Sequence, residues 1–362
     1  MRMQKRSLLF ERFKDACLSL NNATKVVIVH HADADGFCSA VIAAKAIKSI
    51  SGTTPSPILP FNYGNTETEN AIVESVAEAK PDIVFVIDIN IDSRKEFIEK
   101  LEKATERLVI IDHHKIYADC NSEKTVFLKA QNFRKMDGVK YVNSKFAFDL
   151  FSKITDIGEM DWITCVGILG DKGYKYWKKF FEKTTKRTGL TANQMEKLSN
   201  LINAVSVVKK EDFKGLFEEF LSAKNPKELL KSNYFSTLDV FNSVIDKWVA
   251  KFNKEHSYSK KLELMHYTIN PEYRIKSALI DRISEKHPKK TIIIFEEYED
   301  RIGFSARRQD HKIKVNELLE KSVKGIPDSV AGGHAPAAAG SIPKKYYARF
   351  LENLEKDLAE VR

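Results

Sequence analysis

The sequence contains no long hydrophobic run and no paired cysteine motif. No apolar stretch approaches the ~20 residues of a membrane-spanning helix, and residues 1–6 lack the apolar core of a signal peptide. The four cysteines are scattered, without a Cys-x-x-Cys pair, which argues against a disulfide framework and against a structural zinc site. These absences predict a cytoplasmic protein with reduced thiols and no membrane partner.

Internal repeats and low-complexity segments are also missing, and the composition is that of a folded protein. Hydrophobic residues make up 43% and charged residues 30% of the 362 residues, which leaves room for two or three domains. The 59 basic and 50 acidic side chains give a formal net charge of +9. This excess favours an anionic partner.

Apolar runs and helical patterns alternate in the first half of the chain. Strand-like runs are found at 26–29, 56–60, 83–87, 108–111 and 126–128, and helical patterns at 37–50, 70–79, 94–104 and 144–154. The alternation predicts an α/β fold with a mostly parallel, doubly wound sheet covered by helices on both faces.

The pattern changes in the second half. Residues 174–260 are helical and rich in Lys and Phe, which indicates a helical connector. A smaller α/β domain follows. Its predicted elements are a hairpin of 290–296 and 301–305, a helix over 313–320, a loop of small residues over 335–340 and a final helix. The predicted domains are therefore 1–173, 174–260 and 261–362.

Three of the predicted strands end in acidic or histidine residues. These are His31, Asp33 and Asp35 after the first run, Asp88 after the third, and Asp112, His113 and His114 after the fourth. Ligands of open α/β sheets bind beyond the carboxyl ends of the strands, so we expect these side chains to be neighbours. Crowded carboxylates repel one another unless cations lie among them, and oxygen and imidazole ligands without thiolate suit Mn²⁺ or Mg²⁺.

A helix cap is the alternative explanation for each of these residues alone, but not for three strand ends together. Two divalent ions about 3.5–4 Å apart would clamp a phosphodiester and activate water. The pattern therefore favours a metal-dependent phosphoesterase.

With these motifs the chain resembles the DHH phosphoesterases, and within them the RecJ-like nucleases of archaeal type with a DHH-associated (DHHA1) domain. The motifs are, in order, residues 31–36, Asp88, residues 112–114, Asp171, residues 303–307 and residues 332–334. The resemblance covers most of the chain. It implies a DHH domain, a helical connector and a smaller C-terminal DHHA1 domain, with the active site in the cleft between the domains.

The resemblance also implies two bound metal ions, Mn²⁺ or Mg²⁺. His31 and Asp33 would hold one ion, and Asp35, His113 and Asp171 would hold the other. Asp88 would bridge the two ions.

The remaining motif residues would act on the substrate. By resemblance, Asp112 would orient its neighbours, and His114 would contact the scissile phosphate or assist the leaving group. Glycines allow a backbone to approach a phosphate closely, and an arginine can fork onto its oxygens. The residues implied in substrate binding are Arg307, Gly332, Gly333 and His334.

Two assignments stay open. Many family members place the first metal-binding histidine four residues before the first aspartate, where this chain has Val29. His31 lies two residues before Asp33, and His30 is the alternative ligand. Residues 172–187 interleave seven basic residues and one acidic residue with five aromatic ones. That fits either a groove for single-stranded nucleic acid or an amphipathic helix with its lysines in solvent.

The preferred function is a Mn²⁺- or Mg²⁺-dependent exonuclease that hydrolyses single-stranded DNA or RNA to mononucleotides. One alternative is a phosphodiesterase for oligoribonucleotides, cyclic dinucleotides or a nucleotide 3′-phosphate, because the chain is close to the minimal two-domain length. A second alternative is a scaffold in a replication complex, although the carboxylates that such relatives lose are all present here. A replication-complex partner is compatible with catalysis.

Overall fold

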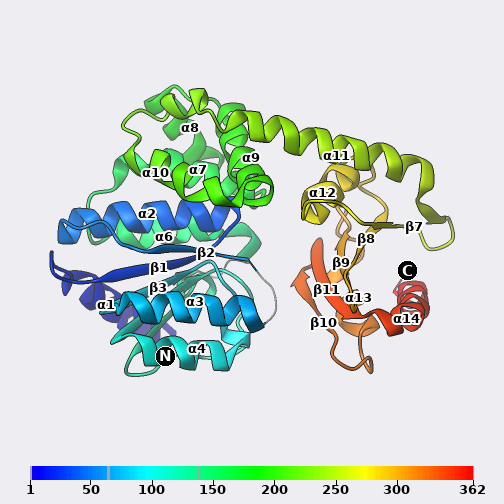
Figure 1. Ribbon diagram of the computed structural model, residues 1–362, viewed down its shortest axis with the longest axis horizontal. Helices are drawn as coiled ribbons and strands as arrows, with labels where there is room; N and C mark the ends of the chain where they lie inside the picture. Colours follow the sequence, from blue (N-terminus) through cyan, green and yellow to red (C-terminus); the bar gives the residue numbers. More distant parts are fainter. Residues whose placement is uncertain (1, 63–65, 135, 137, 362) are drawn as a thin grey trace. The chain divides into compact units, whose positions relative to one another are not determined.

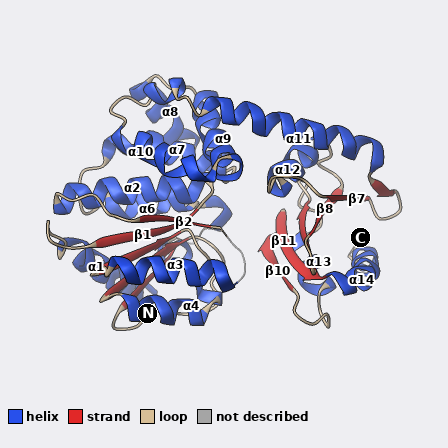
Figure 2. Cartoon of the chain, in the orientation of Figure 1, coloured by secondary structure: helices blue, strands red, loops and turns tan. Residues whose placement is uncertain are grey.

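The computed structural model describes residues 2–62, 66–134, 136 and 138–361. The chain divides into two compact units, Met1–Leu238 and Asp239–Arg362. Each unit combines one β-sheet with helices (Figures 1 and 2), so the predicted α/β fold class is confirmed. No helix in the described ranges has both the length and the hydropathy needed to span a bilayer.

The first unit is built on a five-stranded parallel sheet of order β2-β1-β3-β4-β5. The strands are β1 (Val26–His31), β2 (Ile58–Phe61), β3 (Ile83–Ile87), β4 (Arg107–Asp112) and β5 (Thr125–Lys129). Apolar residues dominate them because both faces of the sheet are covered. The chain changes direction across the sheet between β1 and β3, and ligands bind at such switch points.

Helices cover both faces of this sheet (Figure 1). One face carries α3 (Thr66–Ala79) and α4 (Lys95–Ala104), and the other carries α1 (Arg2–Leu18), α2 (Ala34–Ser51) and α6 (Asn143–Phe151). The remaining helices are α5 (Ala130–Phe133), α7 (Asp161–Gly170), α8 (Lys178–Thr188), α9 (Ala192–Val208) and α10 (Phe213–Ser222). The helices predicted after residue 174 are thus present, and α8, α9 and α10 pack on α7 and α2 within the first unit.

The second unit contains a six-stranded mixed sheet of order β10-β11-β9-β8-β7-β6. The strands are β6 (Ser257–Ser259), β7 (Leu264–Ile269), β8 (Thr291–Glu297), β9 (Arg301–Arg307), β10 (Val330–His334) and β11 (Ala337–Pro343). Helix α12 (Lys276–Lys286) packs on β8 and β9. Helices α13 (Val315–Ser322) and α14 (Tyr347–Glu360) share a core with the sheet, in which Phe350 of α14 packs on Phe295 and Phe304. The long helix α11 (Phe235–Glu255) spans the division between the units.

The predicted hairpin is confirmed as β8 and β9, but the predicted loop over 335–340 is wrong. These small residues belong largely to β11, which pairs with β9 on one side and β10 on the other. Gly and Ala have low strand propensity, so the sequence indicated a loop. Pairing with two neighbours outweighs that propensity, because the strand hydrogen bonds are made by the backbone.

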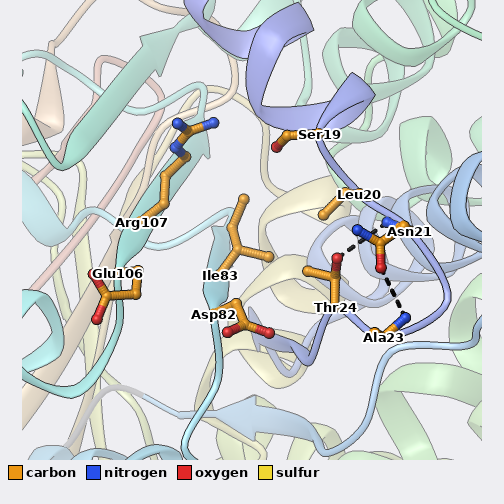
Figure 3. Close-up of a pocket in the computed structure, with 9 residues that line it drawn as sticks. All are labelled: Ser19, Leu20, Asn21, Ala23, Thr24, Asp82, Ile83, Glu106 and Arg107. Atoms are coloured by element: carbon orange, nitrogen blue, oxygen red, sulfur yellow. Dashed lines mark hydrogen bonds between the residues drawn. The ribbon is translucent and has the colours of Figure 1, made fainter.

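The amino-terminal edge of the first sheet carries a pocket of about 600 Å³ (Figure 3). Its lining mixes both signs of charge and includes Asp82, Glu106 and Arg107. None of the groups of potential metal ligands found among the described residues includes a residue of this pocket. The chemistry predicted from the sequence therefore concerns the opposite edge.

Candidate metal centre

The predicted metal ligands meet at the carboxyl-terminal edge of the first sheet. Strands β1, β3 and β4 end there, and α2 and the segment after α7 add further side chains. Three groups have potential ligand atoms within 4.8 Å of one another: His31, Asp33 and Asp88; Asp35, His113 and Asp171; and Asp88, His113 and His114. The first two groups match the ligand sets implied by the resemblance, with Asp88 beside His113 in the third. Metal binding by these groups stays a prediction.

Asp33 caps helix α2 and also contacts His31. One carboxylate oxygen accepts a hydrogen bond from the Gly36 N–H at 2.9 Å, and the other lies 2.8 Å from His31 Nδ1. A Cβ at position 36 would lie 2.4 Å from the His31 carbonyl oxygen. Glycine is therefore required for α2 to begin this close to β1, and the tight connection fixes both side chains.

His30 and His31 have different environments. The His30 ring packs on Phe213 and Phe217, with centroids 6.1 and 5.8 Å apart, and burial lowers its pKa to about 4. Burial alone would also lower the pKa of His31, but the Asp33 carboxylate raises it to about 9. Within the described ranges, His31 belongs to a group of potential ligands and His30 does not.

Asp35 is buried and held by the first turn of α6. Its carboxylate accepts hydrogen bonds from the backbone N–H groups of Asn143 at 2.6 Å and Ser144 at 2.9 Å, at the positive end of the helix dipole. Burial and repulsion from Asp88 and Asp171 nevertheless raise the pKa of Asp35 well above its usual range. Sequence analysis missed Asn143, because only the tertiary fold brings α6 to this carboxylate.

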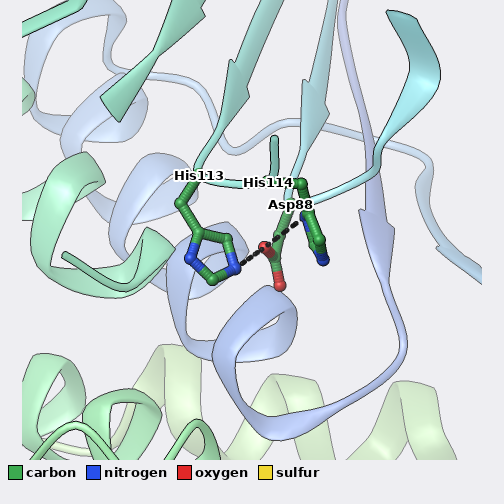
Figure 4. A group of neighbouring side chains, drawn as sticks. All are labelled: Asp88, His113 and His114. Carbon is green, nitrogen blue, oxygen red and sulfur yellow. Dashed lines mark ion pairs between the residues drawn. The ribbon is translucent and has the colours of Figure 1, made fainter. Parts of the chain in front are cut away.

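His113 is oriented by a backbone carbonyl. Its Nδ1 donates to the Gly138 carbonyl oxygen at 3.0 Å, so Nε2 faces Asp88 and Asp171 at 3.3 and 3.4 Å. A Cβ at position 138 would lie 2.1 Å from the His113 carbonyl oxygen, so glycine is needed for this approach. Ion pairs from His113 and His114 converge on Asp88 (Figure 4).

Asp88 has an unusual backbone and an unsatisfied side chain. Its φ of 62° lies in the left-handed region, which non-glycine residues seldom adopt and which is common at functional sites. Its carboxylate is buried, and Oδ1 accepts no hydrogen bond of normal geometry within the described structure. Burial raises its pKa. A divalent cation would satisfy such an oxygen.

Four carboxylates, those of Asp33, Asp35, Asp88 and Asp171, lie in these groups. Burial, with repulsion from Asp33 and Asp88, raises the pKa of Asp171 to about 6. The donors are oxygen and imidazole nitrogen without thiolate, which is the set that suits Mn²⁺ or Mg²⁺. The residues present therefore fit a pair of divalent cations.

Asp112 has the opposite environment, because it is bound to a buried lysine. Its carboxylate accepts hydrogen bonds from His114 Nδ1 at 2.7 Å and from Lys129 Nζ, which also lies 2.9 Å from Asp92 Oδ1. Burial alone would raise the pKa of Asp112, but His114 and Lys129 hold it well below its usual range. Lys129 was not identified from the sequence, where it is one polar residue at the end of an apolar strand.

The predicted substrate residues lie at one end of the second sheet. Ala337 of β11 is in register with both Arg307 of β9 and His334 of β10, which places these two residues about 10 Å apart. Gly333 has a φ of 137°, and a Cβ there would lie 2.6 Å from the Ala337 carbonyl oxygen. This turn of the backbone therefore needs glycine.

The two adjacent arginines differ in exposure. Arg308 is buried and ion-paired with Asp310 and Glu263. Arg307 is less enclosed, and its Nε donates to Asp281 Oδ1 at 2.7 Å. Of the two, Arg307 has the geometry to meet an anion, while Arg308 is part of the internal structure.

Binding of Mn²⁺ is expected to release protons. Asp171, with a pKa of about 6, and His31, with a pKa of about 9, hold protons that a cation must displace. The calorimetric affinity of chelator-treated protein should therefore rise about tenfold per pH unit from pH 6 to pH 8, where His31 loses its proton on binding, and more steeply below pH 6, where Asp171 also holds a proton. Asp171→Asn should bind more weakly and should lose the additional steepness below pH 6. Asp246→Asn, whose side chain is 65% exposed, is the matched control, and a pH-independent affinity would contradict the assignment.

Loss of the Lys129 cation should destabilise the first unit. The Lys129→Met variant leaves Asp112 and Asp92 buried without their cation, which costs about 3–5 kcal/mol in free energy of unfolding. Urea denaturation measures this difference. Lys95→Met, which removes an 89% exposed lysine paired with Glu99, should change it by less than about 0.5 kcal/mol. Equal stability of the two variants would show that Lys129 does not stabilise the buried carboxylates of Asp112 and Asp92.

Two family models match the sequence. The DHH family N-terminal domain matches residues 25–159, and the DHHA1 domain matches residues 265–360. No curated protein matches the chain by sequence.

Solved structures share the fold over nearly the whole chain. A DHH-domain protein described as a member of a family of ribosomal proteins is 16% identical, with a TM-score of 0.77 and coverage of 99% of this chain and 92% of that one. An exonuclease RecJ bound to manganese is 14% identical, with a TM-score of 0.67 and coverage of 99% and 94%.

RecJ from Thermus thermophilus in complex with Mn²⁺ is 14% identical, with a TM-score of 0.72 and coverage of 99% of this chain. The match spans only 55% of the Thermus protein. At such identities the likeness concerns the fold alone. The two family models together match more than half of the chain, which therefore belongs to the DHH/DHHA1 family of phosphoesterases.

Proposed function

We propose that this protein is a metal-dependent exonuclease that hydrolyses single-stranded DNA or RNA to mononucleotides. The observation that carries the proposal is the pair of three-residue groups at the carboxyl edge of the first sheet, one of which includes Asp88 while the other includes its neighbour His113. Two divalent cations held there would stabilise charge on the phosphoryl oxygens and activate water.

The side chains around this pair have distinct tasks in the proposal. Asp112 positions the His114 ring by accepting from Nδ1, and the His114 side chain is 29% exposed. In this proposal the other ring nitrogen, Nε2, donates to the scissile phosphate or to the leaving oxygen. Lys129 keeps Asp112 ionised, so the ring is held whether or not substrate is present.

The second unit is proposed to hold the substrate. Gly332 and the exposed Gly333 lie on β10, at the same end of the sheet as Arg307. The Arg307 Nε donates to Asp281 and its Nη1 donates to the Ala306 carbonyl oxygen, so Nη2 is the nitrogen assigned to phosphate oxygens. His334 is proposed to contact the same anion.

Several further observations support an exonuclease on polymers. RecJ exonucleases share the fold, and two of their structures contain Mn²⁺. A net charge of +9 also favours a polyanion over a small phosphate ester. A replication-complex partner is a compatible proposal, since CDC45 from Entamoeba histolytica has a related fold with a TM-score of 0.55 at 10% identity.

DNA and RNA strands of 2 to 24 nucleotides, labelled at either end and incubated with Mn²⁺, test the proposal directly. We expect stepwise release of mononucleotides from one end. Asp88→Asn should reduce the cleavage rate by more than about 100-fold. That exceeds the loss expected for a residue that only hydrogen-bonds to a metal ligand. The Asp246→Asn variant serves again as the control.

Two outcomes would change the assignment. Unchanged cleavage by Asp88→Asn would remove the proposed site. Hydrolysis confined to di- and trinucleotides would instead favour the phosphodiesterase for very short substrates.

A further inference from the structure

Two chain segments leave the metal centre and meet again at the surface of the first unit. One runs from Gly138, whose carbonyl accepts from His113, to Lys140 two residues later. The other runs from Asp171 to Trp177, whose Nε1 donates to the Lys140 carbonyl oxygen at 2.8 Å. Five residues of extended chain span at most about 18 Å, so residues 174–176 lie within about 18 Å of Asp171.

The meeting point carries aromatic rings with cations beside them. The ammonium groups of Lys140 and Lys175 lie 5.7 and 5.0 Å from the centroid of the Tyr176 ring. The Arg134 guanidinium lies 5.5 Å from the Trp177 ring. We call these five residues the aromatic platform.

The platform is partly open to solvent and firmly supported. The rings of Tyr176 and Trp177 are half-buried, while Lys140, Lys175 and Arg134 are exposed. Beneath it, the buried Lys145 ammonium lies 4.6 Å from the Trp177 ring. The Trp177 ring is thus held in place before any ligand arrives.

The charges of the platform are only partly balanced within the protein. Asp149 pairs with Arg134 at 3.5 Å and with Lys145, and it accepts from the Tyr141 hydroxyl. Lys140 and Lys175 form no ion pair with any residue that the structure describes. Two exposed cations beside an aromatic ring are the combination that takes phosphates and a stacked base.

The structure divides the basic segment 172–187 in two. Helix α8 is amphipathic, with Phe181 and Thr184 buried and its lysines mostly exposed, so the helix interpretation holds there. The preceding turn has a different character, because Tyr176 is flanked by Lys175 and by Lys140 from a distant part of the sequence.

We propose that the aromatic platform binds the single-stranded nucleic acid next to the scissile phosphodiester. A base stacks on Tyr176, while Lys140, Lys175 and Arg134 contact the phosphates. This inference rests on the proposed function and gives it a structural basis for polymers, because the platform adds an aromatic ring and cations outside the metal centre.

Binding is measured without hydrolysis, in EDTA, from the fluorescence anisotropy of labelled dT12 and rU12. Tyr176→Ala should weaken binding roughly 5- to 150-fold, the range for the loss of one stacked base. Tyr176→Phe keeps the ring and should bind as the wild type does. The slope of the logarithm of the binding constant against the logarithm of the salt concentration counts the ions released on binding. Lys140→Gln and Lys175→Gln should each reduce this slope by about one.

Tyr258→Ala provides the matched control. Tyr258 is 46% exposed and has Lys290 5.2 Å from its ring, but it lies on edge strand β6 of the second unit, at the far edge from β10. Mn²⁺-dependent cleavage of a dinucleotide is the second measurement. It should be unchanged in all platform variants.

The outcomes separate this inference from the proposed function. Wild-type cleavage with no effect of Tyr176→Ala on dT12 or rU12 binding would overturn the platform alone. Equal displacement of the strand by poly-glutamate and by poly-rA would also overturn it, because the surface would then be a general anion site. Ring-dependent strand binding without cleavage of any substrate would support the platform and refute the nuclease.

Discussion

The repulsion among carboxylates at the carboxyl-terminal edge of the first sheet is the constraint on which the rest of this molecule depends. Asp35, Asp88 and Asp171 all have raised pKa values, so their charged forms are costly without cations. The surrounding structure keeps them together nonetheless. The α6 amides hold Asp35, and Asp88 is fixed by a backbone hydrogen bond from its N–H to the Ile111 carbonyl.

Environment sorts otherwise similar acidic residues into two kinds. Asp88 is buried without a well-aligned donor and has a raised pKa, whereas Asp112 is buried against Lys129 and has a lowered one. A buried lysine balances the charge of the second kind of carboxylate, whereas no lysine or arginine that the structure describes pairs with the first. The DHH triplet thus contains one aspartate whose charge is balanced by a buried lysine, followed by two histidines that face the centre.

The residues at strand ends could be predicted because apolar runs locate strands, and parallel strands share one carboxyl edge. His31, Asp88 and His113 are brought together for that reason. Lys129 and Asn143 could not be predicted, because their roles depend on contacts across distant segments. The Ala- and Gly-rich strand β11 also escaped prediction, since its residues have low intrinsic strand propensity and its partners are not visible in the local sequence.

Two glycines shape the centre because they lack a Cβ atom. Position 36 brings α2 close to β1, and position 138 brings a carbonyl to His113, although neither glycine has a positive φ. At both positions a Cβ would collide with a backbone carbonyl oxygen, so glycine is needed. The sequence shows that these residues are glycines but not which segments they allow to come together.

All the candidate ligands lie between His31 and Asp171, inside the first unit, while Arg307 and residues 332–334 of β10 belong to the second. The proposed metal ligands and the proposed substrate residues of the second sheet are therefore encoded in separate stretches of the gene. Natural selection can replace or reshape the second stretch to suit a new substrate without rebuilding the first. Such an arrangement allows proteins with very different substrate specificities to inherit one reaction.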